Sequence, residues 1–370
     1  MKLTVERDAI VAAVAALRPI VLTSTQIPIL TCVKIEASGA QMTIEASDLD
    51  HCAIATVPAD VPHMGDVAVD AQRLYGLLST LPAGAHVAME TAGDVLAVAC
   101  GRSRYRLPAL PAVDFPKQLA PSADGASVSL DNDTAKHLLR RVAYSVSTDT
   151  KTRMFLCGCS LHAVEGHLQS VATDGVTLAW SKTDLPAKDA PGIIVPQRAM
   201  SQIVKMGERV TLTWDRKVIR AVTGTLAYAS KLIDGTFPDY PRVVPPEKGD
   251  YLRFDRKALL SAFERLGSVD AKGPAIMTWE AGATAVTMTR EGLGHGAEEI
   301  EGEAASSAGL IPWSVEPTAS TLRAFDGDAI RIRVPDGEGP ALFIDPKDNE
   351  FTAVIMPAWL WMKKPRQAAA

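Results

Sequence analysis

Two periods of hydrophobic spacing alternate along the chain. Segments in which every second residue is apolar, as in half-buried strands, are followed by segments in which apolar residues recur every three or four positions, as in helices. This succession begins at Leu3, again at Val128 and again at Leu252, which is a spacing of about 125 residues. The helices predicted at these starts are 8–18, 134–144 and 256–266. The chain therefore contains one pattern three times.

Each copy continues with paired strands and a second helix. Strand segments that end in a turn are predicted at 44–48 and 170–175, and 286–291 is a looser third copy. The second helices are predicted at 71–81, 197–206 and 315–325. They begin after Asp70, Pro196 and Ser314, which are suitable cap or first-turn residues.

The repeated pattern predicts an α+β fold. Each copy contains two strand–helix–strands halves, with the helices on one face of antiparallel sheets. A chain of 370 residues is too long for one ordinary core, and Pro, Ser and charged residues gather at 116–125 and 245–250. We therefore predict three similar domains, 1–120, 121–248 and 249–370. The repeat alone does not decide how the domains are arranged, and a gene-duplicated protein whose domains do not form a ring is the alternative.

The composition is that of a globular protein in a reducing compartment. Apolar residues make up 47% of the chain and charged residues 22%, and no apolar run approaches the ~18 residues of a membrane span. The N-terminus does not read as a secretion signal. Five cysteines without CxxC spacing are expected to be reduced, and Cys157 and Cys159 are expected to share one face of a strand. These features indicate the cytoplasm.

The charge is unevenly distributed. The net charge of -5 argues against nucleic-acid binding, yet the six predicted helices, counted with their flanking residues as 7–18, 71–80, 133–146, 197–209, 255–266 and 315–325, together carry +7, which leaves -12 for the remainder. Helices that line one surface would form a diffuse basic lining, which binds phosphates without reading bases and is sensitive to salt. The predicted DNA-facing residues, which no aromatic stacking platform accompanies, are Arg7, Arg18, Arg73, Lys136, Arg140, Arg141, Arg198, Lys205, Arg256 and Arg265. Chance segregation of charge is the alternative.

Catalytic signatures are missing from the sequence. It has no phosphate-binding loop, nucleophile elbow or HExxH motif, and its seven histidines are scattered. Thr173-Asp174-Gly175 reads first as a turn, and the acidic run 298–301 as a solvated strand edge or an interface. We therefore predict no catalytic residue, metal or cofactor. An enzyme with an unrecognised acidic site and a DNA-independent scaffold are the competing classes.

Several stretches together resemble the bacterial DNA polymerase III beta subunit, over nearly the whole chain. The stretches that carry the resemblance are Gln26–Leu30, Gly101–Tyr105, Leu110–Pro116, Val171–Gly175, Ser230–Tyr240 and Val354–Pro357. The resemblance implies a head-to-tail homodimer of three domains per subunit. Six domains would close a ring around duplex DNA, with twelve helices lining the hole and the sheets forming the outer wall.

The resemblance also implies two protein-binding surfaces. A cleft between the second and third domains would receive short apolar peptides from the polymerase, the clamp loader and repair proteins. Its residues would be Leu156, Thr173, Gly175, Leu178, Pro238, Arg242, Val243, Val354, Ile355, Met356 and Pro357. In the dimer interface, Tyr105 and Leu107 would meet Ser268 and Val269, and Arg102 and Arg104 would face Glu298, Glu299 and Glu301.

The chain departs from the family pattern at the cleft and at its end. Val176 and Thr177 follow Thr-Asp-Gly where the family usually has His-Arg, which predicts a more apolar rim. Trp359 replaces a usual Arg, Ser24 replaces a usual basic residue, and the chain continues from Trp361 to Ala370. This tail either folds across the cleft rim or frays. A divergent clamp of a phage or plasmid, which serves a different polymerase, is the alternative.

Overall fold

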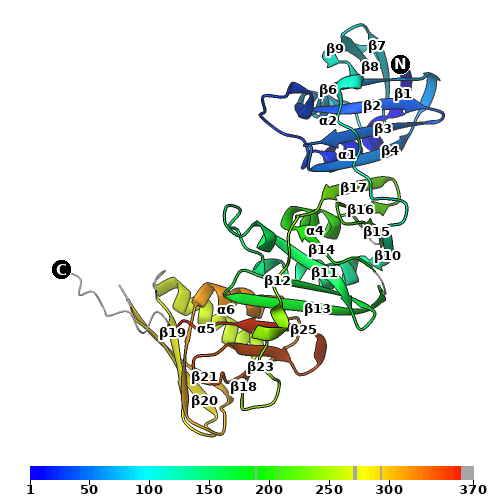
Figure 1. Cartoon of the computed structure of the whole chain (residues 1–370). Coiled ribbons are helices and arrows are strands. Elements are labelled where there is room, and N and C mark those ends of the chain that lie inside the picture. The colour runs from blue at the N-terminus through cyan, green and yellow to red at the C-terminus, as the bar shows by residue number, and fades with distance from the viewer. Residues whose placement is uncertain (188–189, 208, 270–272, 292–293, 360–370) are drawn as a thin grey trace. The chain divides into compact units, whose positions relative to one another are not determined.

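The computed structural model describes residues 1–187, 190–207, 209–269, 273–291 and 294–359. We call 1–120, 121–248 and 249–370 repeats 1, 2 and 3. The described residues divide into two compact units, one formed by 1–132 and 202–232 and the other by 133–201 and 233–370 (Figure 1). Repeat 2 is therefore shared between the units. No helix among the described residues is long and apolar enough to span a membrane.

The first unit is built on a sheet of thirteen strands. Their order is β10-β15-β16-β17-β4-β3-β2-β6-β9-β8-β7-β1-β5. In chain order the strands are β1 (Lys2–Glu6), β2 (Cys32–Ser38), β3 (Gln41–Ser47), β4 (His51–Pro58), β5 (Asp60–His63), β6 (Gly65–Asp70), β7 (His86–Ala92), β8 (Val95–Cys100), β9 (Ser103–Leu110), β10 (Ala126–Asp131), β15 (Arg209–Trp214), β16 (Val218–Thr223) and β17 (Leu226–Lys231).

The second unit is built on a sheet of twelve strands. Their order is β14-β11-β12-β13-β25-β24-β23-β18-β21-β20-β19-β22. In chain order the strands are β11 (Gly158–Val164), β12 (His167–Thr173), β13 (Thr177–Pro186), β14 (Ile193–Pro196), β18 (Tyr251–Asp255), β19 (Ala275–Trp279), β20 (Ala285–Glu291), β21 (His295–Glu303), β22 (Gly309–Trp313), β23 (Ala329–Arg333), β24 (Ala341–Asp345) and β25 (Asp348–Ile355).

The same strand joint occurs once in each unit. In the first unit β17 of repeat 2 pairs with β4 of repeat 1, with Ala229 opposite Cys52. In the second unit β25 of repeat 3 pairs with β13 of repeat 2, with Val354 opposite Leu178. Both joints are antiparallel, and each joins the last strand of one repeat to the fourth sheet strand of the repeat before it. Neighbouring repeats therefore share continuous sheets.

The helices begin close to the predicted residues and pack on the sheets. They are α1 (Arg7–Leu17), α2 (Ala71–Thr80), α3 (Asn132–Ala135), α4 (Gln197–Val204), α5 (Arg256–Val269) and α6 (Val315–Ala324). Helix α1 buries Ile10, Val14 and Leu17, which recur at helical spacing, and it packs against β3, β4 and α2. Similarly, α5 packs against α6, β20 and β21. The predicted α+β architecture with helices on antiparallel sheets is confirmed.

A side chain at the start of the first helix of each repeat binds the end of the second helix. Arg7 donates from Nε to the Leu78 carbonyl, at 3.0 Å, and from Nη2 to that of Ser79, at 2.5 Å. Asn132 donates to the Val204 and Gly207 carbonyls. These hydrogen bonds satisfy carbonyls that a helix end leaves without partners.

Arg256 makes the corresponding bonds in repeat 3, to the carbonyls of Leu322 and Gly327. Only 9% of Arg256 is exposed, and the side chain of Arg7 is 16% exposed. The prediction that Arg7 and Arg256 face DNA is therefore wrong. Their guanidinium groups are used inside the fold, where they hold paired helices together.

The helix predicted at 134–144 differs from the prediction. One α-helical turn, α3, passes into a π-helical segment, η3 (Lys136–Arg140), followed by a 3₁₀ turn, η4 (Ala143–Ser145). The Arg141 amide donates to the Lys136 carbonyl five residues back, and the Ser170 hydroxyl donates to the Leu138 carbonyl. Buried Ser170 thus hydrogen-bonds a backbone carbonyl of this segment, and helical spacing alone does not predict such a tertiary contact.

All five cysteines are free, and all except Cys157 are buried. Burial raises the pKa of Cys159 to about 12, so this thiol stays protonated. Cys157 precedes β11, in which Cys159 lies, so the expectation that the two share a strand face is wrong. Cys157 instead follows a 3₁₀ turn, η5 (Met154–Leu156), which shifts the start of the strand.

Glu45 is a buried carboxylate in β3, with only 4% of its surface exposed. Its Oε2 accepts a hydrogen bond from Gln118 at 3.0 Å, whereas Oε1 is buried without a hydrogen-bond partner. Burial raises the pKa of Glu45, with the Gln118 hydrogen bond opposing the shift. Because the folded state holds the proton more tightly than the unfolded state, ionisation of Glu45 lowers stability as pH rises through the folded pKa.

We predict that Glu45→Gln raises the free energy of unfolding at pH 7, by about 1 kcal/mol. The neutral amide keeps the Gln118 contact and removes the cost of burying a charge. The gain should disappear below pH ~4, where Glu45 is protonated in both states. Urea unfolding at several pH values measures it, with Asp60→Asn, which removes an exposed carboxylate on β5, as the control. A gain that does not depend on pH would contradict this account.

Candidate functional site

An apolar groove lies where repeats 2 and 3 join, within the second unit. It encloses about 770 Å³ between β13, β25 and an irregular segment at 238–246. Nine of the eleven predicted cleft residues line it: Leu156, Thr173, Gly175, Leu178, Pro238, Arg242, Val243, Val354 and Met356. Its apolar floor contains Leu178 and Val354, which are 4% exposed and lie opposite each other in paired strands.

Ile355 and Pro357 do not line this groove. Ile355 is fully buried, and because side chains alternate along a strand it points away from the face that Val354 presents. The prediction that Ile355 and Pro357 belong to the lining is therefore wrong. The run Val354–Pro357 matches the family as a block, but only alternate members can face one groove.

Thr173-Asp174-Gly175 forms the turn that the sequence predicts. Asp174 Oδ1 accepts hydrogen bonds from the amides of Val176 and Thr177, at 2.8 and 2.7 Å, and Gly175 has a φ of 92°. The Asp174 carboxylate therefore shapes the backbone of the turn, as Asx turns do.

The two departures from the family at 176 and 177 have different positions. Val176 is 43% exposed at the groove rim, and its carbonyl accepts the Met356 amide at 2.8 Å. Thr177 is 2% exposed, and its hydroxyl donates to Asp174. The apolar rim is therefore formed by Val176 together with the exposed side chains of Val243 and Met356.

The sequence did not point to several lining residues. They are Asp239, Tyr240, Val244, Pro245, Pro246, Arg333, Asp336, Gly339 and Pro340. Most lie in the linker 245–250, in the residues just before it, or after β23, and linker composition carries no signal of a binding wall. Tyr240 directly follows the motif Phe-Pro-Asp, but its hydrogen-bond partners lie on β11 and β12, which are distant in sequence.

The predicted DNA-facing residues fall into different environments. Arg18, Arg73, Arg140, Arg198 and Lys205 are exposed. The Arg18 guanidinium lies 4.4 Å from the centre of the Tyr75 ring, and Lys136 pairs with Asp133 at 3.2 Å. These side chains keep positive charge at the surface of the helical segments.

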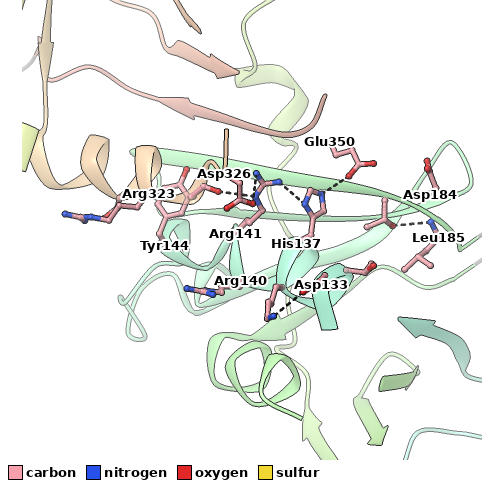
Figure 2. Close-up of a pocket in the computed structure, with 15 residues that line it drawn as sticks. Asp133, His137, Arg140, Arg141, Tyr144, Asp184, Leu185, Arg323, Asp326 and Glu350 are labelled. Atoms are coloured by element: carbon pink, nitrogen blue, oxygen red, sulfur yellow. Dashed lines mark hydrogen bonds and ion pairs between the residues drawn. The ribbon is translucent and has the colours of Figure 1, made fainter. Parts of the chain in front are cut away.

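Arg141 is buried in a second cavity of the same unit, which encloses about 930 Å³. It donates to the carbonyl of Ala324 at 3.1 Å and to Asp348 at 2.8 Å, and it pairs with Asp326 at 3.3 Å. Figure 2 shows Asp326 and His137 beside its guanidinium. The prediction that Arg141 faces DNA is therefore wrong, because the side chain joins repeat 2 to repeat 3.

His137 extends this cluster from η3. Its Nδ1 lies 2.8 Å from Nη1 of Arg141, and its Nε2 lies 3.4 Å from Glu350 (Figure 2). Although burial opposes it, the hydrogen bond from Arg141 lowers the pKa of Asp348. Acidic and basic groups thus neutralise each other along most of the cavity, while Arg140 on its rim makes no ion pair with the described residues.

The predicted interface residues lie along two strand edges. Arg104 and Tyr105 are exposed on β9, Arg102 lies in the turn before it, and Leu107 is half-buried. Glu299 and Glu301 are exposed on β21, and Ser268 and Val269 end α5 beside that strand. Within the described residues, no strand pairs with β9 opposite β8 at 103–107, or with β21 opposite β20 at 295–301.

Glu298 has a partner inside its own chain. Arg265 donates to both Glu298 oxygens at 2.7 Å, which raises the pKa of Arg265 and lowers that of Glu298. Because its charge is neutralised by Arg265, Glu298 contributes less to the predicted interface than Glu299 and Glu301. The same pair reduces the positive charge that Arg265 can present to DNA. Among the described residues, no cluster of three His, Cys, Asp or Glu side chains has metal-binding geometry.

Comparisons with known proteins agree with this arrangement. A family model of the DNA polymerase III beta subunit N-terminal domain matches residues 1–119, and one of its central domain matches residues 129–239. The beta sliding clamp of Caulobacter vibrioides is 32% identical over 373 residues, covering 96% of this chain and 99% of that protein.

Solved structures are similar over the same share of the chain. The beta sliding clamp of C. crescentus has a TM-score of 0.90 and 31% identity. The DNA polymerase III subunit beta of Pseudomonas aeruginosa has a TM-score of 0.91 and 25% identity. In both comparisons the match covers 96% of this chain and 99% of the other.

The adjacent arginines 140 and 141 provide a matched test of the buried cluster. We predict that Arg141→Gln lowers the free energy of unfolding by roughly 2 kcal/mol, because it removes the hydrogen bonds of a buried guanidinium to the Ala324 carbonyl and to half-buried Asp348. Arg140→Gln should change it by less than ~0.5 kcal/mol, since that side chain is exposed. Calorimetric unfolding at neutral pH compares them. Equal effects would contradict the assignment of Arg141 to the interior.

Proposed function

The chain belongs to the DNA polymerase III beta subunit family, the bacterial beta sliding clamps, and from this premise we propose how its surfaces perform the clamp function. It is a DNA sliding clamp, a non-catalytic processivity factor that works with DNA, with a polymerase and with a second copy of itself. We place its work in the cytoplasm and its domains at 1–120, 121–248 and 249–370.

The observation that carries the proposal is the strand joint that occurs twice inside the chain. It pairs the last strand of one repeat with the fourth sheet strand of the repeat before it. By the same rule, β21, the fourth strand of repeat 3, should pair with the last strand of another repeat, and within the described residues it does not. β9, the last strand of repeat 1, likewise has no fourth strand of a preceding repeat to pair with. A head-to-tail dimer that pairs β21 with β9 of the second copy uses both edges and closes a ring of six domains.

The repeat also predicts which side chains meet at this interface. Tyr105 corresponds to Tyr228, because hairpins align Ser103 with Leu226. At the internal joint Tyr228 is 3% exposed, and its hydroxyl lies 2.7 Å from His51 Nδ1. Tyr105, which is 38% exposed, would be buried in the same way, beside Leu107 and the end of α5 at Ser268 and Val269.

Strand alternation separates the charges from this apolar contact. Glu298 and Gly296 face α5, so Glu299 and Glu301 occupy the opposite face of β21. On β9, Arg104 and Arg106 alternate with Tyr105 in the same manner. We therefore add Arg106 to the interface, and pair Arg104 and Arg106 with Glu299 and Glu301, while Arg102 flanks them at the turn. This complementarity favours the head-to-tail orientation.

We predict that Arg104→Glu with Arg106→Glu weakens dimerisation at least ~10-fold at low salt, because like charges then face each other. Adding Glu299→Lys and Glu301→Lys should restore most of the loss. Sedimentation equilibrium over a range of concentrations measures the dissociation constant, with Arg216→Glu, in the exposed turn between β15 and β16, as the control. Dimerisation that survives the double reversal would contradict the strand-edge interface.

The proposed DNA-facing surface consists of basic side chains that remain exposed on helices. It contains Arg18, Arg73, Lys136, Arg140, Arg198, Lys205 and Arg265, the last weakened by Glu298. A closed ring holds duplex DNA topologically, so weak phosphate contacts that read no bases are sufficient and allow sliding. The positive charge of this surface is modest, because Arg7, Arg141 and Arg256 make hydrogen bonds inside the fold instead of lying on it.

We predict that Arg140→Glu with Lys205→Glu reduces loading onto nicked circular DNA several-fold for any sequence, and makes binding less steeply dependent on salt. Once loaded, the wild-type ring should stay on the circle and leave when the DNA is cut. Gel filtration of clamp on nicked and linearised DNA measures both. A loss that depends on base sequence, or equal retention on linear DNA, would overturn the proposal.

The groove between β13, β25 and residues 238–246 is the proposed site for partner peptides. Its floor is apolar, and Val176, Val243 and Met356 leave apolar surface exposed at the rim. Leucine or aromatic side chains from the polymerase, the clamp loader or repair proteins would fill it and supply most of the affinity. The tail residues 360–370 lie outside the described residues, so their competition with such peptides stays a prediction.

A further inference from the structure

The proposed peptide groove has one regular wall and one irregular wall. The regular wall consists of β13 and β25, which are hydrogen-bonded to each other. The opposite wall is the segment 237–250, which we call the strap. Its only helical element is a short 3₁₀ turn, η6 (Tyr240–Val243), and it pairs with no strand of the described chain. Its last residue, Asp250, accepts the Val334 amide through its backbone carbonyl at 2.9 Å, and side-chain contacts hold the rest of the strap in position.

The first half of the strap is attached through Tyr240. Gln169 of β12 is 3% exposed and donates from Nε2 to the Tyr240 hydroxyl at 2.7 Å. His162 of β11 lies beside the same hydroxyl, with Nε2 at 3.3 Å, and the two rings meet edge to face. Burial lowers the pKa of His162, which keeps its ring neutral at physiological pH.

The second half of the strap is attached through Arg333 at the end of β23. The side chain is only 4% exposed, and it donates from Nε to the Lys248 carbonyl at 3.1 Å. Its Nη2 donates to Asp336 at 2.7 Å, so the guanidinium is also fixed from its own side. A Cβ at Gly249 would lie 2.9 Å from Arg333 Nε, and Gly249 has a φ of +153°, so this contact requires glycine.

Between these two attachments the strap presents its apolar side chains to the groove. Val243 and Val244 lie there, followed by Pro245 and Pro246, which stiffen the backbone. Val244 packs on the floor cluster that contains Leu178 and Val354. The distance between the two walls of the groove is thus set by contacts at Tyr240 and Lys248. Tyr240 and Arg333 also line the groove, whereas Gln169 lies behind the lining.

We propose that Gln169 and Arg333 are positioning residues for partner binding, which fix the strap at the distance from β25 that an apolar peptide needs. This inference rests on the proposed function of the groove. A wall that is already in place spares the bound complex the entropy of ordering it, so loosening either attachment weakens binding. Gln169 is not part of the groove lining, so its effect on binding must pass through Tyr240, whereas Arg333 both lines the groove and holds the strap.

The test uses the full-length dimer and a short fluorescein-labelled peptide with leucine and phenylalanine anchors. Fluorescence anisotropy gives its dissociation constant for Arg333→Gln, Arg333→Lys and Gln169→Leu. We expect a loss of about 10-fold for Arg333→Gln and for Gln169→Leu, mainly through faster dissociation. Arg333→Lys should recover part of the affinity, because an ammonium group can still donate to the Lys248 carbonyl. Arg253→Ala removes an exposed arginine of the same repeat and is the matched control.

A double-mutant cycle with Val243→Ala separates positioning from a general loss of stability. If Arg333 acts through the strap, Val243→Ala should cost much less in the Arg333→Gln background than in wild type. Additive effects, or unchanged affinity in Arg333→Gln and Gln169→Leu, would overturn the proposal. Dimerisation should be the same in all these variants.

Met356→Ala distinguishes failure of this inference from failure of the groove itself. If wild type binds the peptide, Met356→Ala weakens binding and the strap variants do not, the groove stands and the positioning role is refuted. If Met356→Ala binds as tightly as wild type, the peptide site lies elsewhere and both proposals fail.

Discussion

Backbone pairing between repeats is the constraint on which the rest of the molecule depends. The last strand of a repeat must find an open edge in its neighbour, because unpaired amides and carbonyls along a strand are costly and promote association. Two such edges are paired within the chain, at β4 with β17 and at β13 with β25. The edges left on β9 and β21 carry opposite charge, and the pairing that joins the repeats is the one we propose for the assembly.

Most of the architecture could be predicted from the sequence, because strand and helix periods are local signals. The first helix of repeat 1 and both helices of repeat 3 begin within one residue of their predicted starts. The wrong assignments concern basic residues whose environment is tertiary. Arg7, Arg141 and Arg256 are arginines on predicted helices, and periodicity cannot tell an exposed guanidinium from one that binds carbonyls at the end of another helix.

The groove shows the same boundary between local and tertiary information. Matching motifs located Leu178, Val354 and Met356, because these residues lie in or beside stretches whose sequence resembles the family. The opposite wall was predicted only at Pro238, Arg242 and Val243. Tyr240 and Arg333 were missed, since they acquire their roles only from Gln169 and Lys248, which are distant in sequence. Buried polar contacts of this kind depend on geometry that hydrophobic spacing does not encode.

The two internal joints also explain why a groove forms at one of them. At the joint of repeats 1 and 2 the facing pair is Cys52 and Ala229, and Leu119 from the linker packs against them. At the joint of repeats 2 and 3 the corresponding pair is Leu178 and Val354. Small side chains leave room for the chain's own leucine to cover the first joint. The larger pair forms a broad apolar floor, which the strap borders without filling, so the second joint can accept an apolar side chain from another protein.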